Sequence, residues 1–496
     1  MPVDKRHKLY DKNIKRWETV RDCIEGEDVI KASREKYLAR LTRQSNEDYE
    51  RYLLRAQFFG GTGRAADGLH GDVFSKPPQH TGDVSKEFEI LLKDVDLMGT
   101  SLTQFASDIV WDCMQTNWGG ILVDYSKDAD VLTLRQAEEA GCRAFLKWYP
   151  AERVINWKYG NKDGQNQLIF VVLEEACDDI NPTDPFSAAE YIKYRALSFN
   201  ESGDYVQYIY DSRVGLEEPT EIVVPKIKGQ PLKKLPFFTC PARNPEKSML
   251  LDLAYQNLSH YRQSADYENG KHYTSIPTPI ALGYSPDKDE EGNVKPVSIG
   301  GTNFLFFSND TGILGDVKFL EFAGSGIEAL HKGMESTEER MAILGAHIIT
   351  REKKGVETAA AAKIHRSGEN GVLSAFIRNI SEQVTLAMRL KAVWDGLPEE
   401  AMEQWSFELN TDYDLIREDA QLLNVLLNGR NSGEIPRISM FRALKNIELI
   451  PEDWDFDMFL EETEKDAPPP PEPVLFPAVT DSNINQNVNQ EPNEQD

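Results

Sequence analysis

The sequence has few cysteines, and they are far apart. Its five cysteines include no Cys-x-x-Cys pair and lie at Cys23, Cys113, Cys142, Cys177 and Cys240. An odd number of widely spaced thiols does not suit a disulfide framework, and zinc sites built from cysteine need closer pairs. We therefore expect reduced thiols and no structural zinc.

Long apolar runs are also missing. No stretch approaches the roughly eighteen apolar residues that a membrane-spanning helix needs. Residues 1–8 are polar and basic, without the apolar core of a signal peptide. We expect a protein that is made in a cytoplasm and does not contact a membrane.

Positive charge is in short supply. The chain has 55 lysines and arginines against 82 aspartates and glutamates, which gives a net charge of −27 over 496 residues. Such a surface repels nucleic-acid phosphates, so sequence-specific binding to duplex DNA is not expected over most of it. Two interpretations of this charge are open. It can simply keep the protein soluble, or it can belong to a surface along which DNA slides without binding.

Catalytic motifs are absent. The sequence contains no His-Glu-x-x-His and no Gly-x-Ser-x-Gly, and the glycine-rich stretch 60–63 lacks the Lys-Ser/Thr ending of a phosphate loop. Asp124, at the end of an expected strand, lies near Asp128 and Asp130 and could begin a two-metal nuclease site. Clusters of this kind arise by chance in an acidic chain. We expect no enzyme, cofactor or metal, and keep a metal-dependent nuclease or head-processing enzyme as the alternative.

The most informative region combines long helices with a strand-rich insert. Apolar spacing predicts helices at 248–273, 326–349 and 357–394. The insert at 274–325 contains four expected short strands, at 278–282, 297–299, 303–307 and 317–322. One more strand is expected at 405–409. This order indicates a structural or mechanical part.

The first 245 residues read as an α+β region with helices first and an antiparallel meander second. Helical spacing covers most of residues 1–55, with Trp17, Val20 and Ile24 on one face. The pattern breaks at 58–64, and 70–78 reads as a turn. Residues 88–97 predict a short helix, and Ser101 is the expected N-cap of an amphipathic helix. Strands are expected at 121–125, 168–172, 191–197, 205–210 and 221–224.

The C-terminal region predicts a small helical cap and then a tail. Helices are expected at 415–427, 436–446 and 454–460. From Ala467 the sequence is rich in proline, asparagine and glutamine and has no lysine or arginine. We expect that tail to be disordered.

One short basic loop lies between the second and third long helices. It contains Arg351, Lys353 and Lys354, followed by Gly355. Isolated basic turns usually point into solvent. In so acidic a protein, the cluster is also a candidate for contact with DNA phosphates.

These features together resemble the portal protein (head–tail connector) of tailed bacteriophages, and look closest to a branch of uncharacterised phage portal-like proteins. The motifs that carry the resemblance are Asp-Val-Ile-Lys-Ala and Tyr-Leu at 28–32 and 37–38, Gly-x-Val-Phe-x-Lys-Pro at 71–77, Asp-x-x-Gly-x-Ser-Leu at 96–102, Gly-Gly-Ile-Leu-Val-Asp at 119–124, and Tyr-Pro-Ala-Glu-x-Val-Ile-Asn-Trp at 149–157. Each motif alone is weakly specific, whereas the order and spacing of all of them together are considerably more specific. The similarity runs to about residue 465.

The resemblance implies a portal-type fold and a closed ring of typically about twelve subunits at one vertex of a phage head. Residues 1–245 would be the wing, 246–273 and 326–349 the two stem helices, and 274–325 the clip. Residues 350–357 would be the tunnel loop, 358–410 the long helix with a returning wing strand, 411–466 a short crown, and 467–496 a disordered acidic tail. The tunnel-loop residues Arg351, Lys353 and Lys354 would face double-stranded DNA.

The implied function is a channel for packaging and ejecting DNA, and the family has no catalytic residues to carry over. Expected partners are further copies of the chain, the major capsid and scaffolding proteins, the terminase large subunit, head-completion or tail adaptor proteins, and DNA without sequence preference. The expected location is the portal vertex of the virion.

Overall fold

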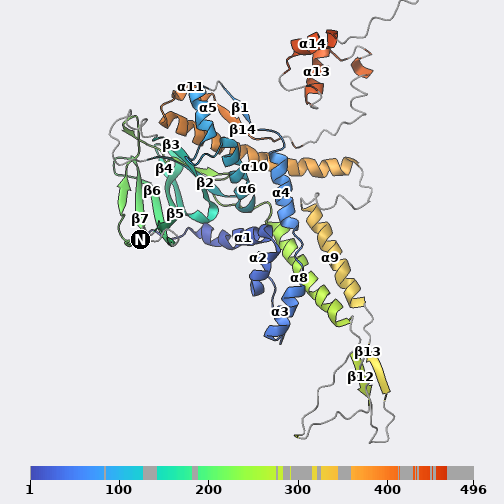
Figure 1. Ribbon diagram of the computed structural model, residues 1–496. Helices are drawn as coiled ribbons and strands as arrows, with labels where there is room; N and C mark the ends of the chain where they lie inside the picture. Colours follow the sequence, from blue (N-terminus) through green and yellow to red (C-terminus); the bar gives the residue numbers. More distant parts are fainter. Residues whose placement is uncertain are drawn as a thin grey trace, which may run out of the picture. The chain divides into compact units, whose positions relative to one another are not determined.

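The computed structural model divides into two compact units, Met1–Tyr413 and Asp414–Asp496. It describes residues 2–82, 85–126, 142–180, 188–274, 278–282, 291, 316–320, 325–344, 359–411, 413, 428–430, 432, 435–446, 450 and 454–465. Both helices and antiparallel sheets build the first unit, which confirms the α+β class (Figure 1). No helix in the described part of the chain is long and apolar enough to cross a membrane.

The N-terminal helices form where their spacing predicts. They are α1 (Lys8–Glu25), α2 (Glu27–Ala32) and α3 (Asn46–Arg55). Trp17 and Val20 are buried on one face of α1, and Ile24 is half-buried beside them. Ser45 caps α3 by accepting a hydrogen bond from the Asp48 amide at 3.1 Å.

The break expected at 58–64 and the turn expected at 70–78 are wrong where α4 covers them, because this helix spans Gly61–Val73. Residues 58–60 and 74–78 are non-helical, as expected. No local side chain caps this glycine-rich helix. Asn257, from a helix that follows much later in the chain, supplies the cap. Its Oδ1 accepts from the Thr62 amide at 2.9 Å and from the Thr62 hydroxyl at 3.0 Å, while its Nδ2 donates to the Phe59 carbonyl at 2.7 Å.

Replacing Asn257 with Ala should therefore destabilise the folded chain. Asn257 is fully buried, and its loss leaves buried polar groups without partners, at a cost of about 1–3 kcal/mol. The midpoint of thermal unfolding measures this loss. Asn269→Ala, on the same helix but only half-buried, is the control and should change the midpoint less. Equal midpoints for the two variants would contradict the role of Asn257 as a cap.

Two antiparallel sheets make up the strand-rich part. The first has the order β11–β2–β3 and contains β2 (Gly119–Tyr125), β3 (Ala144–Pro150) and β11 (Phe237–Cys240). The second has the order β4–β5–β6–β7–β8 and contains β4 (Val154–Lys162), β5 (Gln165–Ile180), β6 (Ala188–Phe199), β7 (Tyr205–Asp211) and β8 (Glu221–Val223). The predicted meander is confirmed. β5 and β6 run several residues beyond the predicted bounds, because their polar ends continue the pairing.

Two further helices flank the sheets. In α6 (Leu102–Thr116), the predicted cap is confirmed, since the Ser101 Oγ accepts from the Gln104 amide at 3.3 Å. The apolar side chains along one face of α6 are buried: Leu102, Phe105, Ile109, Val110, Cys113 and Met114. By contrast, α5 (Lys86–Lys93) ends earlier than predicted. The Asp96 carboxylate turns the following loop by accepting from the amides of Met98 and Thr100, at 2.9 and 3.2 Å.

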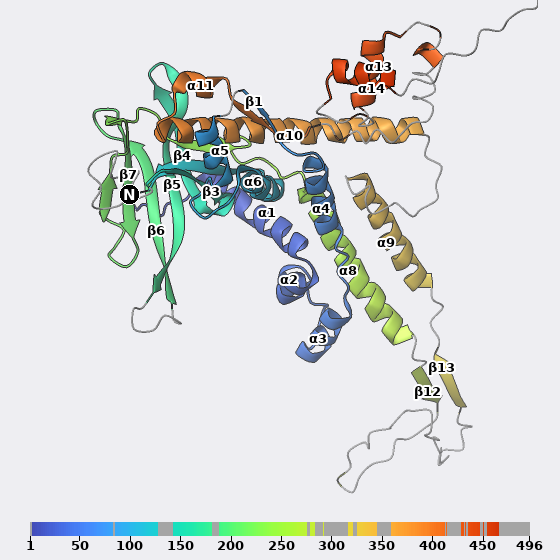
Figure 2. The same ribbon diagram turned by 45° about the horizontal axis from the view of Figure 1, so that its top comes forward.

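The long-helix region follows the predicted order. It consists of α8 (Leu251–Thr274), the paired strands β12 (Thr278–Leu282) and β13 (Asp316–Leu320), α9 (Ser325–Ile343), and α10 (Ala359–Trp394). α8 and α9 lie side by side, and β12 and β13 continue beyond their far ends (Figures 1 and 2). The strands expected at 297–299 and 303–307 lie outside the described residues, as do residues 345–349.

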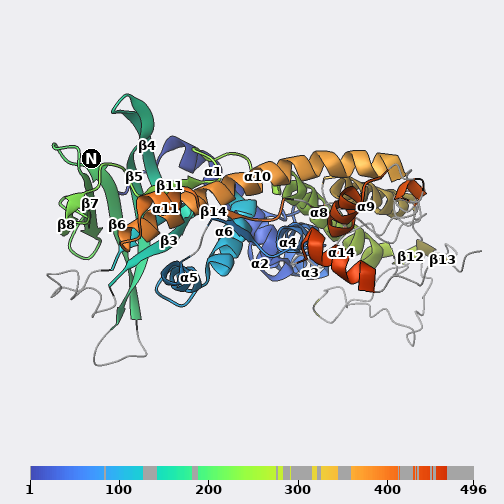
Figure 3. The same cartoon turned by 90° about the horizontal axis from the view of Figure 1, so that it is seen from above.

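α10 lies along the β11–β2–β3 sheet, and the returning strand β14 (Ser406–Glu408) lies beside it (Figure 3). The short helix α11 (Glu399–Glu403) connects the two. β14 pairs with β1 (Gln79–Thr81), an unpredicted strand from the first part of the chain, instead of joining the meander. Two polar residues of α10 hold the returning segment around β14 in place. Ser381 Oγ accepts a hydrogen bond from the Leu409 amide at 3.1 Å, and Thr385 Oγ1 accepts one from the Phe407 amide at 3.0 Å.

The second unit contains α13 (Arg437–Asn446) and α14 (Phe456–Lys465), close to the helices expected at 436–446 and 454–460. Phe441 packs against Phe456 and Phe459, with ring centroids 5.6 and 5.2 Å away. The helix expected at 415–427 and the tail from residue 467 lie outside the described residues.

Candidate functional site

The predicted DNA-contact residues cannot be placed in this fold. Arg351, Lys353 and Lys354 lie outside the described residues, between the end of α9 and the start of α10. Asp128 and Asp130 also lie outside them. Two of the predicted features can be examined in detail: Asp124 and the α8–α9 pair.

Asp124, at the end of β2, belongs to a buried polar network. Its Oδ2 lies 3.0 Å from Nη1 of Arg195 on β6, and its Oδ1 accepts from Nε2 of Gln207 on β7 at 3.0 Å. Arg195 Nη1 also donates to Gln207 Oε1 at 2.6 Å. Each oxygen of the Asp124 carboxylate thus already has a protein donor.

Glu175 on β5 completes this network. Its Oε2 accepts from Arg195 Nη2 at 3.4 Å, its Oε1 lies 2.8 Å from Lys147 Nζ, and the Tyr149 hydroxyl also donates to Oε1. Burial alone would raise the pKa of Glu175, but the charges of Arg195 and Lys147 outweigh burial and lower that pKa to about 2. The same carboxylates raise the pKa of Arg195, although its burial acts in the opposite direction.

The network joins the two sheets, since Asp124, Lys147 and Tyr149 come from the first and Glu175 and Arg195 from the second. No group of three or more potential metal ligands occurs within the described ranges. Because each oxygen of Asp124 accepts from a protein donor, this residue is best explained as a structural carboxylate. A sequence signal for the network exists, because Glu175 continues the buried alternation of Val171 and Leu173 on β5.

The lowered pKa of Glu175 gives a pH prediction. A carboxyl group whose pKa is lower in the folded state than in the unfolded state stabilises the folded state at any pH above its unfolded pKa, here about 4.5. For Glu175 this contribution is about 3 kcal/mol, and it is lost as the pH falls from 4.5 towards 2. We expect the difference in unfolding midpoint between the wild type and Glu175→Gln to shrink over that interval. Every other carboxyl group is present in both proteins, so its titration does not change the difference between their midpoints. A difference that stays constant from pH 5 to pH 2.5 would contradict the assignment.

The α8–α9 pair is held by contacts along its length. Glu338 Oε1 lies 3.2 Å from Nε2 of the buried His260, and the Thr337 hydroxyl donates to Gln263 Oε1 at 3.1 Å. Further along, the rings of Tyr267 and His331 stack with centroids 5.7 Å apart. The two helices therefore form a defined antiparallel hairpin.

On its other side, α8 is fixed to the N-terminal helices. The Tyr52 hydroxyl donates to Asp266 Oδ1 at 2.6 Å, and Arg55 Nη1 donates to Asn269 Oδ1 at 3.2 Å. Ser264 Oγ accepts from the Gln57 amide at 3.0 Å. On the side of α9 away from α8, no hydrogen bond joins it to another element within the described part of the chain, and Thr337, Met341 and Ala342 are its buried side chains.

The C-terminal end of α10 is locked onto the first sheet. Lys391 is fully buried and lies 2.9 Å from Asp395 Oδ2, and Asp395 Oδ1 accepts from the Ala144 amide of β3 at 2.6 Å. Burial lowers the pKa of Lys391. This ion pair fixes the register of the long helix on the sheet.

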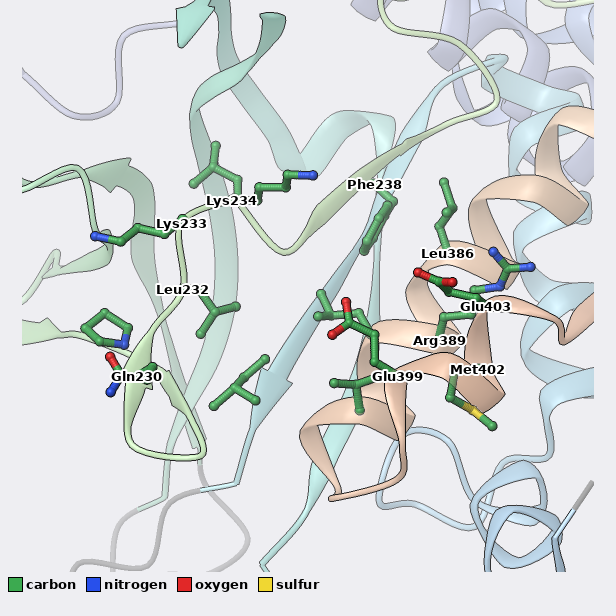
Figure 4. Close-up of a pocket in the computed structure, with 15 residues that line it drawn as sticks. Gln230, Leu232, Lys233, Lys234, Phe238, Leu386, Arg389, Glu399, Met402 and Glu403 are labelled. Atoms are coloured by element: carbon green, nitrogen blue, oxygen red, sulfur yellow. The ribbon is translucent and has the colours of Figure 1, made fainter. Parts of the chain in front are cut away.

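A groove of about 600 Å³ lies between α10, α11 and the segment leading into β11 (Figure 4). Leu232, Phe238, Leu386 and Met402 give it apolar walls, and Lys233, Lys234, Arg389, Glu399 and Glu403 are the charged residues that line it. The residues that line it include no serine, cysteine or histidine.

Comparisons with known proteins give limited likenesses. Residues 249–395, from α8 to the end of α10, match a family described as a domain of unknown function (DUF4055). No curated protein matches the chain.

Among solved structures, a chain of the "Virion of native gene transfer agent (GTA) particle" is 10% identical with a TM-score of 0.33, covering 75% of this chain and 85% of that one. A chain of the "Neck of empty GTA particle computed with C6 symmetry" is 11% identical with a TM-score of 0.39, covering 79% of this chain and 90% of that one. Both TM-scores are low, so the function proposed below is derived from the chain's own residues.

Proposed function

We propose that this chain is a ring-forming portal protein of a phage head, which forms a channel for double-stranded DNA. Residues 1–245 are its wing, α8 and α9 its stem helices, and 274–325 its clip. Residues 350–357 form the tunnel loop, 358–410 the long helix with its returning strand, and 411–466 the crown. The terminase motor and the tail adaptors dock on the clip.

The observation that carries the proposal is the hairpin of α8 and α9, closed at its far end by β12 and β13. Helices of 24 and 19 residues extend about 36 Å and about 28 Å. The body of the protein fixes α8, whereas most of α9 stays uncovered in a single chain. An amphipathic helix that is so little covered by its own chain fits a wall built from several copies.

The charge distribution also supports a DNA channel. A net charge of −27 disfavours lasting adhesion of DNA to the walls. A few basic residues at 351, 353 and 354 from each subunit would then supply transient, sequence-independent contacts with phosphates.

Negative-stain microscopy of the purified full chain tests the proposal. We expect annular particles with a central hole. Compact monomers at micromolar concentration would contradict it and favour an enzyme or another soluble factor.

Changing Arg351, Lys353 and Lys354 together to Ser should leave ring assembly intact and lower the fraction of DNA-filled heads. The expected cause is the loss of phosphate contacts, because exposed loop charges contribute little to stability. Counting filled and empty heads measures the effect. The matched control changes Arg51, Lys86 and Lys93 to Ser, which removes the same charge from exposed helical positions. Normal packaging and retention in the loop variant would refute the contact.

A further inference from the structure

The two long sides of α8 have different neighbours. α9 lies on one side, and α1, α2 and α3 lie on the other (Figures 1 and 2). His260, Gln263 and Tyr267 point to α9, whereas Tyr255 and Arg262 line a cavity on the α1 side. One chain therefore presents two separate surfaces, one on each side of the hairpin.

The surface on the α1 side has more basic than acidic exposed residues, although the chain as a whole is acidic: Asp11 is exposed beside the lysines of α1. Lys8, Lys12 and Lys15 are exposed at positions i, i+4 and i+7 of α1, and within the described part of the chain they form no ion pair. Lys15 and Arg262 also line a cavity of about 590 Å³. We refer to Lys8, Lys12, Lys15 and Arg262 as the basic face.

Other groups at this cavity do not cancel that charge. Glu18 also lines it, but lies 2.7 Å from the Lys36 ammonium group and so is already matched. Arg262 Nε donates to the Tyr37 carbonyl at 2.9 Å, which orients its guanidinium group without neutralising it. Tyr255, 47% exposed, adds a large aromatic surface to the same wall.

The outward flank of α9 is acidic. Glu328, Glu335 and Glu339 are exposed at positions i, i+7 and i+11, which places them on one flank of the helix. Lys332 lies 2.9 Å from Glu328, whereas Glu335 and Glu339 form no ion pair among the residues described. We refer to these three glutamates as the acidic stripe.

We propose that the acidic stripe of one copy packs against the basic face of the next copy. Lys8 and Lys12 have the same sequence spacing as the unmatched Glu335 and Glu339, about 6 Å along each helix, so the charges can meet in register. Because the two surfaces lie on opposite sides of α8, each copy can use both at once. Such a head-to-tail contact closes into a ring when the rotation from one copy to the next divides a full turn into a whole number of steps. The inference rests on the proposed ring and names the residues that form it.

Charge reversal with rescue tests this contact. One variant carries Lys12→Glu and Lys15→Glu, a second carries Glu335→Lys and Glu339→Lys, and a third carries all four changes. We expect each double variant to need at least about ten times more protein than the wild type to form rings, and the fourfold variant to recover most of that loss. All four positions are exposed, so far-ultraviolet circular dichroism should show unchanged folding.

The outcomes separate this contact from the ring itself. Wild-type protein that stays monomeric overturns the proposed function and this inference with it. Rings from the wild type and from both double variants at the same concentration overturn this inference alone. So does a fourfold variant that folds but fails to assemble, or a lysine variant that assembles normally and loses only binding to a DNA duplex.

Discussion

Replacing Arg195 with Met should lower stability by about 3 kcal/mol, because the buried carboxylate of Glu175 and the half-buried carboxylate of Asp124 lose their shared counter-charge, and only Lys147 remains beside Glu175. The side chain of Arg195 is 18% exposed and that of Glu175 is 8% exposed, so water cannot replace the missing partner. Chemical denaturation of the purified protein measures the loss.

Arg213→Met is the matched control, in the turn that follows β7 of the same sheet. Arg213 pairs with Asp211 and Asp179, but its side chain is 44% exposed. Its loss should leave the denaturation midpoint almost unchanged, because exposed ion pairs contribute little. Equal shifts for the two variants would show that the network does not hold the two sheets together.

The second large effect is expected in the segment between β12 and β13. Replacing residues 284–295 with a short Gly-Ser linker should leave rings intact and lower binding of the terminase large subunit or the tail adaptor by at least about tenfold. The antiparallel pairing of β12 and β13 lies outside the replaced segment, and the hairpin helices keep their own contacts. Binding of the two partner proteins to immobilised rings measures the effect.

A shorter substitution in another loop controls for that experiment. Replacing residues 213–219, between β7 and β8, with the same kind of linker alters a surface that the proposal gives to the wing. It should not change partner binding. Unchanged binding of both partners to the 284–295 variant would refute the clip assignment.

The sequence predicts best those elements whose cause is local. Ser101 and the apolar stripe behind it mark the start and the buried face of α6 in the local sequence. The long helices α8 and α10 follow from sustained helical spacing, and the meander from alternation between turn residues.

The elements that the sequence does not predict depend on distant partners. α4 needs the buried amide of Asn257, which comes from another helix. The role of Asp124 is hidden for the same reason, because Arg195 and Gln207 lie on the other sheet and meet it only after the two sheets have packed together. Acidic residues close together in sequence suggested a metal site, whereas the fold gives Asp124 a cationic partner.

The mass of the purified full chain in dilute solution tests the central claim most directly. A portal ring predicts one dominant species of roughly twelve times the 56.2 kDa of a single chain. A single species at 56.2 kDa, unchanged as protein concentration rises, would contradict it.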